Sequence, residues 1–257
     1  MIMQQQKIVF ITGASSGIGY ACAHEYAKHG YQIILAARRV EKLQNLAQEL
    51  AQQYQTESHI LELDVSQRQA TLNKIAELPQ AWQAIDVLIN NAGLARGFAA
   101  LQKGSLDDWD EMIDTNLKGL LYVTKAILPG MVQRNVGYVV NIGSIAGHEC
   151  YPNGNVYAAT KHAVAALSKS MRMDLLGTQV RVSAVDPGML NTEFSQVRFH
   201  GDKARADQVY HGITPLDAAD VADAVYYCTS RPQHVTIEDL VIMPTQQASA
   251  TLAHREN

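Results

Sequence analysis

The chain has 257 residues, of which 47% are hydrophobic and 18% are charged, and its formal net charge is −4. This composition supplies enough apolar side chains for a large core and excludes an intrinsically disordered protein. The small negative charge gives no electrostatic basis for binding nucleic acid or an anionic membrane, so we expect neither as a partner.

No apolar stretch is long enough to cross a membrane, because Lys125 and Pro129 interrupt the richest one, Gly119–Met131. The start of the chain, Met1–Lys7, is rich in glutamine and lacks the apolar core of a signal peptide. The three cysteines are isolated and form neither a disulfide framework nor a pair of metal ligands. These features predict a cytoplasmic protein.

Short, mostly apolar segments alternate along the chain with longer segments of helical period, such as Val40–Tyr54 and Gln67–Leu78. Strands that are apolar on both sides are typical of a parallel sheet covered by helices on both faces. We predict seven strands, at Lys7–Ile11, Gln32–Ala37, His59–Leu63, Asp86–Asn90, Tyr138–Ile142, Val180–Val185 and Asp239–Met243. The expected architecture is a single doubly wound α/β domain over residues 1–245, followed by a polar tail at 246–257.

Two further helices are predicted from their start signals. Ser105 followed by Asp108 is typical of a helix start. The segment from Thr214 to Asp217 has a capping hydroxyl, a proline at the first helical position and an acid in the first turn, so we expect a helix to begin there.

A glycine-rich loop, Thr12-Gly13-Ala14-Ser15-Ser16-Gly17-Ile18-Gly19, follows the first predicted strand and opens into a helix. Glycines let backbone N–H groups approach a pyrophosphate, and the helix N-terminus presents partial positive charge to it. The spacing G-x-x-x-G-x-G differs from the commoner dinucleotide fingerprint, and no Gly-Lys-Ser/Thr follows as in a P-loop. The loop predicts a Rossmann-type dinucleotide site. The alternative is a turn that uses glycine for packing alone.

The second predicted strand ends in Ala36-Ala37-Arg38-Arg39. Sites for NAD place an acid at this point to bind the ribose hydroxyls, and that acid would repel a 2′-phosphate. Two guanidinium groups suit a phosphate instead, so Arg38 and Arg39 predict NADP as the cofactor. The alternative is a pair of solvated arginines at a helix start.

Several motifs follow in order: Asp64-Val65, Asn90-Asn91-Ala92-Gly93, Asn116, Ser144, Tyr157-Ala158-Ala159-Thr160-Lys161 and Pro187-Gly188. With them, the chain resembles the classical short-chain dehydrogenase/reductases from about residue 7 to residue 245. The resemblance implies a catalytic set of Asn116, Ser144, Tyr157 and Lys161. It implies that the cofactor is bound by Gly13, Ser15, Ser16, Gly17, Ile18, Gly19, Arg38, Arg39, Asp64, Val65, Asn91, Gly93, Tyr157, Lys161, Pro187, Gly188 and Thr192. Asn90 is expected to tie the central strands together.

The chemistry explains these residue types. Hydride transfer to a carbonyl needs a proton donor, and the reverse reaction needs the same group as a base. A free phenol has a pKa near 10 and is a poor base at neutral pH. Because Tyr157 and Lys161 are one helical turn apart, we expect the ammonium to lie beneath the phenol and lower its pKa. Ser144 is expected to bind the substrate oxygen, and Asn116 to anchor a water that passes protons to Lys161. As alternatives, Tyr157 would be a core residue and Asn116 a polar residue on a solvated helix face.

Three segments, Ile142–Gly147, Gly154–Tyr157 and Thr192–Asp202, and the ending Met243–Gln246, resemble the NADP-dependent 3-hydroxy acid dehydrogenases. That group oxidises serine, allo-threonine and related 3-hydroxy acids and reduces malonic semialdehyde. The resemblance therefore implies an NADP-dependent oxidoreductase for small 3-hydroxy acids. One alternative is an NADPH-dependent carbonyl reductase acting on 3-oxoacyl, sugar, steroid or xenobiotic ketones. A second, of another class, is a non-catalytic NADP-sensing protein, which would be expected to have lost a catalytic residue.

Arg198 lies in the segment after Pro187-Gly188, which in this fold covers the active site as a mobile lid. We predict that it binds the substrate carboxylate. Alternatively, Arg198 pairs with Glu193 or Asp202 on the loop surface, and Arg96 is the carboxylate anchor.

His148 and Glu149 place charge in the loop between Ser144 and Tyr157. We interpret His148 as a hydrogen-bonded loop residue rather than a second acid–base group. His24-Glu25 lacks the second histidine of a zinc-protease helix, so no metal site is predicted.

The resemblance also implies a homotetramer built through two long helices, Ser105–Gln133 and Asn155–Gly177. The tail Gln246–Asn257 is too polar to extend the core, and we expect it to reach a neighbouring subunit.

Overall fold

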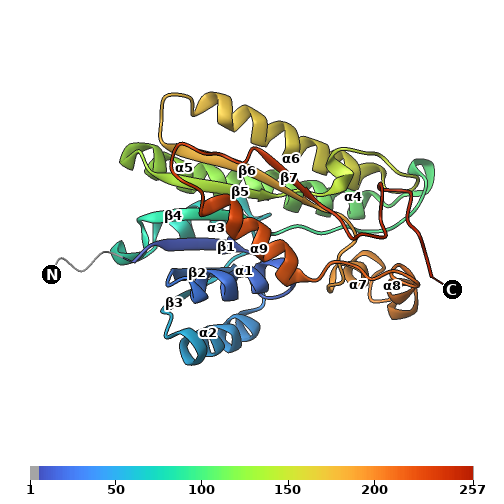
Figure 1. The fold of residues 1–257 in the computed structure, drawn as a ribbon, viewed down its shortest axis with the longest axis horizontal. Coiled ribbons are helices and arrows are strands. Elements are labelled where there is room, and N and C mark those ends of the chain that lie inside the picture. Colours follow the sequence, from blue (N-terminus) through green and yellow to red (C-terminus); the bar gives the residue numbers. More distant parts are fainter. Residues whose placement is uncertain (1–5, 257) are drawn as a thin grey trace.

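The structure is a computed structural model and describes residues 6–256. Seven strands form one parallel sheet in the order β3-β2-β1-β4-β5-β6-β7, and helices cover both faces (Figure 1). The strands are β1 (Ile8–Thr12), β2 (Gln32–Ala37), β3 (Ser58–Glu62), β4 (Ile85–Asn90), β5 (Gly137–Ile142), β6 (Val180–Pro187) and β7 (Asp239–Ile242). The predicted doubly wound fold is confirmed, and each strand lies within two residues of its expected bounds.

Helices and short helical turns connect the strands. They are α1 (Gly17–Lys28), α2 (Val40–Tyr54), α3 (Arg68–Ala76), η1 (Gln80–Trp82), η2 (Leu101–Lys103), α4 (Leu106–Ile113), η3 (Asp114–Gly119), α5 (Leu120–Arg134), η4 (Ile145–Gly147), α6 (Asn155–Asp174), α7 (Phe194–Arg198), α8 (Lys203–Gln208) and α9 (Ala218–Thr229).

Two hydrophobic cores lie on opposite faces of the sheet, because successive side chains of a strand point to opposite sides. In β1, Val9 and Ile11 pack with α1, α2 and α9, whereas Ile8 and Phe10 pack with α3, α5 and α6. Double coverage explains why the inner strands are mostly apolar. The edge strands differ, since β3 and β7 are each only partly buried.

The prediction that a helix begins at Thr214 is wrong by three residues. Helix α9 starts after Asp217, whose carboxylate accepts hydrogen bonds from the backbone N–H groups of Ala219 and Asp220. The preceding residue, Leu216, is extended and bridges to Leu190. The backbone hydrogen bonds of Leu216 with Met189 and Asn191, and the capping box that Asp217 forms with Asp220, outweigh the capping hydroxyl of Thr214.

The first long helix expected to build an assembly is interrupted. Helices α4 and α5 are joined by η3, a single π-helical segment that contains Asn116. Such segments are rare and are frequently found at functional sites. The second long helix is α6, which begins at Asn155 as expected and ends at Asp174.

No helix within residues 6–256 has the length and apolar character needed to span a membrane. Most of the glutamine-rich start, Met1–Lys7, lies outside the described residues.

The C-terminal tail, described up to Glu256, packs on its own chain, and its expected contact with a neighbouring subunit stays a prediction. Gln247 is buried and accepts a hydrogen bond from the N–H of Met189. Arg255 donates to the carbonyl oxygens of Val209 and His211, which follow α8. The C-terminus lies on the same side of the molecule as α7 and α8 (Figure 1). A polar tail can pack in this way because hydrogen bonds with backbone N–H and carbonyl groups, rather than apolar contacts, hold it.

Candidate active site

A cavity of about 640 Å³ opens at the carboxyl ends of the strands. It lies between β1 and β4, where the strand order changes direction. From β1 the chain adds β2 and β3 towards one edge of the sheet, and from β4 it adds β5, β6 and β7 towards the other edge. Ligands of open parallel sheets bind at such a switch point.

Most of the predicted site residues line this cavity. They are Gly13, Ser15, Ser16, Gly17, Ile18, Arg38, Arg39, Asp64, Val65, Asn91, Gly93, Ser144, Tyr157, Lys161, Pro187, Gly188, Thr192 and Arg198. The cavity lining does not include Gly19 or Asn116. The contacts of these two residues place them directly behind the cavity wall.

The glycine loop follows β1 and is shaped by close backbone contacts. Gly13 and Gly17 have φ angles of +67° and +56°, which favour glycine. A Cβ on Gly19 would lie 2.5 Å from the carbonyl oxygen of Gly13 and 2.6 Å from Nδ2 of Asn91. Gly19 is therefore required for packing, while the open N-terminus of α1 suits the pyrophosphate of a dinucleotide.

Arg38 and Arg39 follow β2 at the rim of the cavity, and both side chains are exposed. Arg39 donates to the hydroxyl groups of Ser15 (3.1 Å) and Ser16 (2.6 Å) and pairs with Glu193 at 2.8 Å. Burial alone would raise the pKa of Glu193, but hydrogen bonds from Lys42 and Arg39 outweigh it and hold that pKa at about 2. The rim thus keeps a net positive charge beside the glycine loop, which suits a 2′-phosphate.

Tyr157 and Lys161 lie on successive turns of α6, and both are buried. The Lys161 ammonium is 5.8 Å from the centroid of the Tyr157 ring and donates to the carbonyl oxygen of Ile142 at 2.9 Å. Ser144 caps η4 by accepting a hydrogen bond from the Ala146 N–H at 3.1 Å. Its hydroxyl faces the phenol across the cavity, so the structure brings the three predicted groups together.

Burial raises the pKa of Tyr157, and the neighbouring Tyr151 adds to this effect. A hydrogen bond with Ser144 and the charge of Arg198 lower the pKa of Tyr157, but they do not offset burial. Burial also lowers the pKa of Lys161 to about 8, against the charge of Asp186. In the protein alone, therefore, the phenol is a proton donor, and its use as a base needs additional positive charge.

Asn116 is buried by the π-helical segment and is held by three hydrogen bonds. Its Oδ1 accepts from the N–H of Leu94, and its Nδ2 donates to the Leu94 carbonyl and the Thr160 hydroxyl. A Cβ on Gly93 would lie 3.3 Å from Asn116 Oδ1 and 3.7 Å from Lys161 Nζ. The absence of a side chain at Gly93 leaves space between these two polar atoms. Because Asn116 is buried, the alternative of a solvated helix face is excluded.

Asn90 fulfils its expected structural role. Its Nδ2 donates to Oδ1 of Asn141 on β5 and to the hydroxyl of Thr124 on α5, both at 2.9 Å.

Arg198, at the end of α7, points into the cavity rather than pairing with an acid. It donates to the hydroxyl of Tyr151 at 2.9 Å and to the Gly97 carbonyl at 3.3 Å. Its guanidinium lies 5.0 Å from the ring centroid of Phe98 and 5.5 Å from that of Tyr157. The alternative pairing with Glu193 or Asp202 is not observed.

Arg96 has a different role from the one considered as an alternative. It makes two hydrogen bonds to Glu111, of 2.6 and 3.1 Å, and donates to the Val197 carbonyl at 2.7 Å. Its charge is already paired and it ties α7 to α4. Arg96 is therefore a poor candidate for the substrate anchor.

Sequence analysis missed the aromatic surroundings of Arg198. Phe98 and Tyr151 both line the cavity and stack at 6.4 Å between centroids. No motif marks them, although their positions in loops that flank Asn91 and Tyr157 were a usable signal. His148 is hydrogen-bonded to Asp186, as its interpretation as a loop residue requires. The absence of a metal site remains a prediction.

Comparison with known proteins identifies the family. Residues 7–203 match the model of the short chain dehydrogenases. The chain belongs to this family, as the motifs had implied.

Similar proteins are found along nearly the whole chain. The NADP-dependent 3-hydroxy acid dehydrogenase YdfG of Escherichia coli is 45% identical over 251 residues, which cover 97% of this chain and 100% of the relative. Sulfoacetaldehyde reductase 2 of Chromohalobacter salexigens is 45% identical over 247 residues, covering 96% and 97%. The closed form of a serine dehydrogenase complexed with NADP⁺ superposes with a TM-score of 0.91 at 45% identity, covering 97% of this chain and 100% of that one.

Proposed function

We propose that this protein transfers a hydride between NADP and a small 3-hydroxy acid, of the serine, allo-threonine or 3-hydroxypropionate type. The observation that carries the proposal is the position of Arg198. The guanidinium of Arg198 lies in the same cavity as Tyr157, only 5.5 Å from the phenol ring. This spacing suits a substrate with an anionic group close to its reacting carbon.

The names of two relatives support this substrate class. In a 3-hydroxy acid, one methylene or substituted carbon separates the carboxylate from the reacting carbinol carbon. Sulfoacetaldehyde has its sulfonate at the same separation from its carbonyl carbon. Both kinds of substrate thus place an anion at one distance from the reacting centre, and a guanidinium binds either anion bidentately.

The cofactor is expected to lie along the glycine loop, with its pyrophosphate at the N-terminus of α1 and its 2′-phosphate at Arg38 and Arg39. Thr192, Pro187 and Gly188 would border the nicotinamide, and Asp64 with Val65 the adenine. When bound, NADP supplies or accepts the hydride.

The chain's own residues supply the proton and the orientation. Arg198 binds the carboxylate, Ser144 donates a hydrogen bond to the reacting oxygen, and Tyr157 exchanges the proton with that oxygen. Lys161 holds positive charge beneath the phenol, and Asn116 anchors a water that passes protons to Lys161. A closed cavity strengthens each of these interactions because bulk water is excluded.

We further propose that the protein is a cytoplasmic homotetramer. Large apolar side chains remain exposed along the helices expected to form the contacts, including Leu106, Leu121 and Met173. Such exposed side chains on adjacent helices suit burial against other copies of the chain.

A rate panel tests the proposed function. Purified protein is assayed with NADP and NAD on serine, allo-threonine, 3-hydroxypropionate and a neutral secondary alcohol, and with NADPH on malonic semialdehyde and sulfoacetaldehyde. We expect a clear preference for NADP and for anionic substrates. Equal kcat/KM on neutral and anionic substrates would favour the general carbonyl reductase, and absence of turnover on every substrate would favour the NADP-sensing protein.

A further inference from the structure

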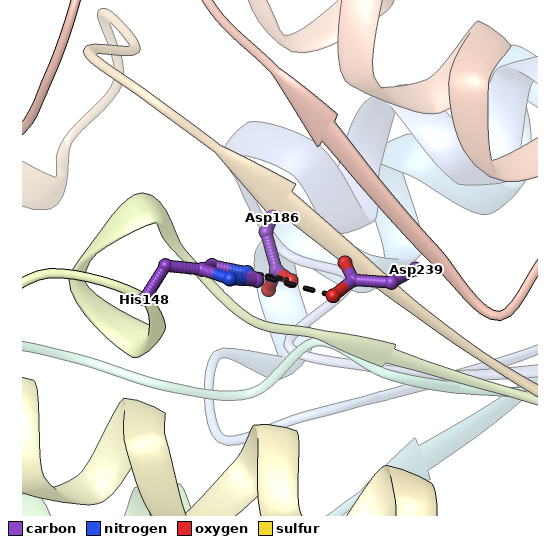
Figure 2. A group of neighbouring side chains, drawn as sticks. All are labelled: His148, Asp186 and Asp239. Atoms are coloured by element: carbon purple, nitrogen blue, oxygen red, sulfur yellow. Dashed lines mark hydrogen bonds and ion pairs between the residues drawn. The ribbon is translucent and has the colours of Figure 1, made fainter.

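A hydrogen-bonded cluster lies behind the active-site loop, outside the proposed catalytic set. Figure 2 shows His148 from the segment after β5 pointing towards Asp186 of β6 and Asp239 of β7. His148 Nε2 lies 2.8 Å from one carboxylate oxygen of Asp186 and 3.7 Å from a carboxylate oxygen of Asp239. The polar atoms of the three residues all lie within 4.8 Å of one another.

The sheet register places the two carboxylates together. Asp239 pairs with Ala184, and Asp186 pairs with Val241 on the neighbouring strand. Residues two apart on a strand share a face, so both acids point to the same side. Their exposure differs, because the Asp186 side chain is 2% exposed whereas those of His148 and Asp239 are 30% and 28% exposed. The cluster thus connects a buried carboxylate to solvent.

The buried carboxylate holds the backbone of a residue in the active site. Its Oδ1 accepts a hydrogen bond from the Ser144 N–H at 2.8 Å, while its Oδ2 is the oxygen that faces His148. Gly143 makes this contact possible, because a Cβ there would overlap Asp186 Oδ1. An ionised carboxylate accepts hydrogen bonds about twice as strongly as a neutral group. The charge on Asp186 therefore determines how firmly Ser144 is held.

Four ionisable groups act on Asp186 from the elements packed around it. They are His148, Asp239, and, from α6, Tyr157 and Lys161. Burial and the hydrogen bond with Asp239 raise the pKa of Asp186, the hydrogen bond with His148 lowers it, and together they place that pKa at about 6. His148 and Asp239 thus act on the charge of Asp186 in opposite directions.

We propose that His148 and Asp239 are positioning residues that act through Asp186 to fix Ser144 against the reacting oxygen, and that they set the lower pH limit of the reaction. The proposal rests on the proposed function of the same site. Asp186 touches neither substrate nor cofactor in this scheme, and its role is to hold the main chain of Ser144.

The reductive direction isolates this effect. Tyr157 donates a proton in carbonyl reduction, so its own titration does not reduce the rate at acid pH. A decline of kcat/KM on the acid side therefore reports another group. With Asp186 as that group, ionised carboxylate is present above its pKa, and kcat/KM should fall as the pH drops through about 6.

Two variants should shift the pH at which kcat/KM declines on the acid side, which we call the acid limb, in opposite directions. His148→Ala removes the partner that favours ionised Asp186, so the limb should shift up by roughly one pH unit. Asp239→Asn removes the competing carboxylate and supplies an amide donor, so the limb should shift down by roughly one pH unit. The measurement is kcat/KM for NADPH-dependent reduction of malonic semialdehyde between pH 5 and 8.

Two surface variants serve as matched controls. His29→Ala removes a contact of 2.9 Å between His29 and Glu25 at the C-terminal end of α1. Glu238→Gln neutralises an acid that is adjacent to Asp239 in the sequence and pairs with Arg172. Both should keep the unmodified pH profile.

Opposite shifts support the proposal, whereas an unchanged acid limb in both variants, or an equal loss at every pH, would overturn it. Activity that requires an added divalent cation and is lost with EDTA would also overturn it, in favour of cation binding by the cluster. Failure of the proposed function looks different, because the unmodified protein would then show no NADPH-dependent reduction.

Discussion

At the scale of single residues, the proposed chemistry depends on the proton of Tyr157. We expect Tyr157→Phe to abolish turnover, because the ring and its packing with Phe194 remain while the transferable proton is lost. NADPH binding, measured by fluorescence titration, should change little. If the variant retained most of the unmodified rate, another acid–base group would have to act.

Arg198 provides a second residue-scale prediction, which separates substrate recognition from lid structure. A charged hydrogen bond is worth roughly 1.5–3 kcal/mol, so Arg198→Ala should lower kcat/KM on 3-hydroxy acids by about ten- to two-hundred-fold. Small neutral alcohols, where accepted, should be almost unaffected.

Variants of two other arginines serve as controls for Arg198→Ala. Arg205 on α8 lies over the Phe199 ring, and Arg205→Ala should change neither substrate class. Arg96 ties α7 to Glu111, so Arg96→Ala should weaken turnover of both classes alike. A uniform loss in Arg198→Ala would assign Arg198 to the shape of the lid instead of to the substrate.

At the scale of elements, the sequence predicts best what local chemistry decides. The strands are recognisable because an apolar run is required wherever helices cover both faces, and the glycine loop because positive φ angles favour glycine. The π-helical segment at Asn116 was not predicted, since its hydrogen bonds to Leu94 and Thr160 join segments distant in sequence. The cluster of His148, Asp186 and Asp239 was missed for the same reason: strand register brings the two carboxylates together, and His148 comes from the segment after β5.

The contribution of a helix cap to the free energy of unfolding can be tested at the start of α9. Asp217 caps the helix, and the Asp220 carboxylate accepts a hydrogen bond from the backbone N–H of Asp217. Asp217→Ala should lower the free energy of unfolding by about 1 kcal/mol, measured by denaturant titration. The exposed Asp223, inside the same helix, is the control, and Asp223→Ala should change stability by less than about 0.5 kcal/mol. Equal effects would mean that the cap contributes nothing specific.

At the scale of the whole molecule, distant segments of one chain together line the cavity. The glycine loop, α6, the lid helix α7, the segment after α8 at Val209 and Tyr210, and the tail residues Gln247, Ala250 and Arg255 all contribute to its lining. Assembly is therefore expected to add rigidity to these elements, in particular through α6, which holds Tyr157 and Lys161. A dissociated chain would keep Tyr157 and Lys161 but lose the contacts between subunits that support α6.

The predicted homotetramer can be tested by the mass in solution. Light scattering should give about four times the chain mass of 28.2 kDa. Leu121 is 42% exposed on α5, and Leu121→Glu would bury an unpaired charge in the expected contact, so the mass should fall. Ala51→Glu adds the same charge to the exposed face of α2, outside that contact, and should leave the mass unchanged. A stable monomer in the unmodified protein would refute the assembly, while a tetramer unaffected by Leu121→Glu would place the contact on other helices.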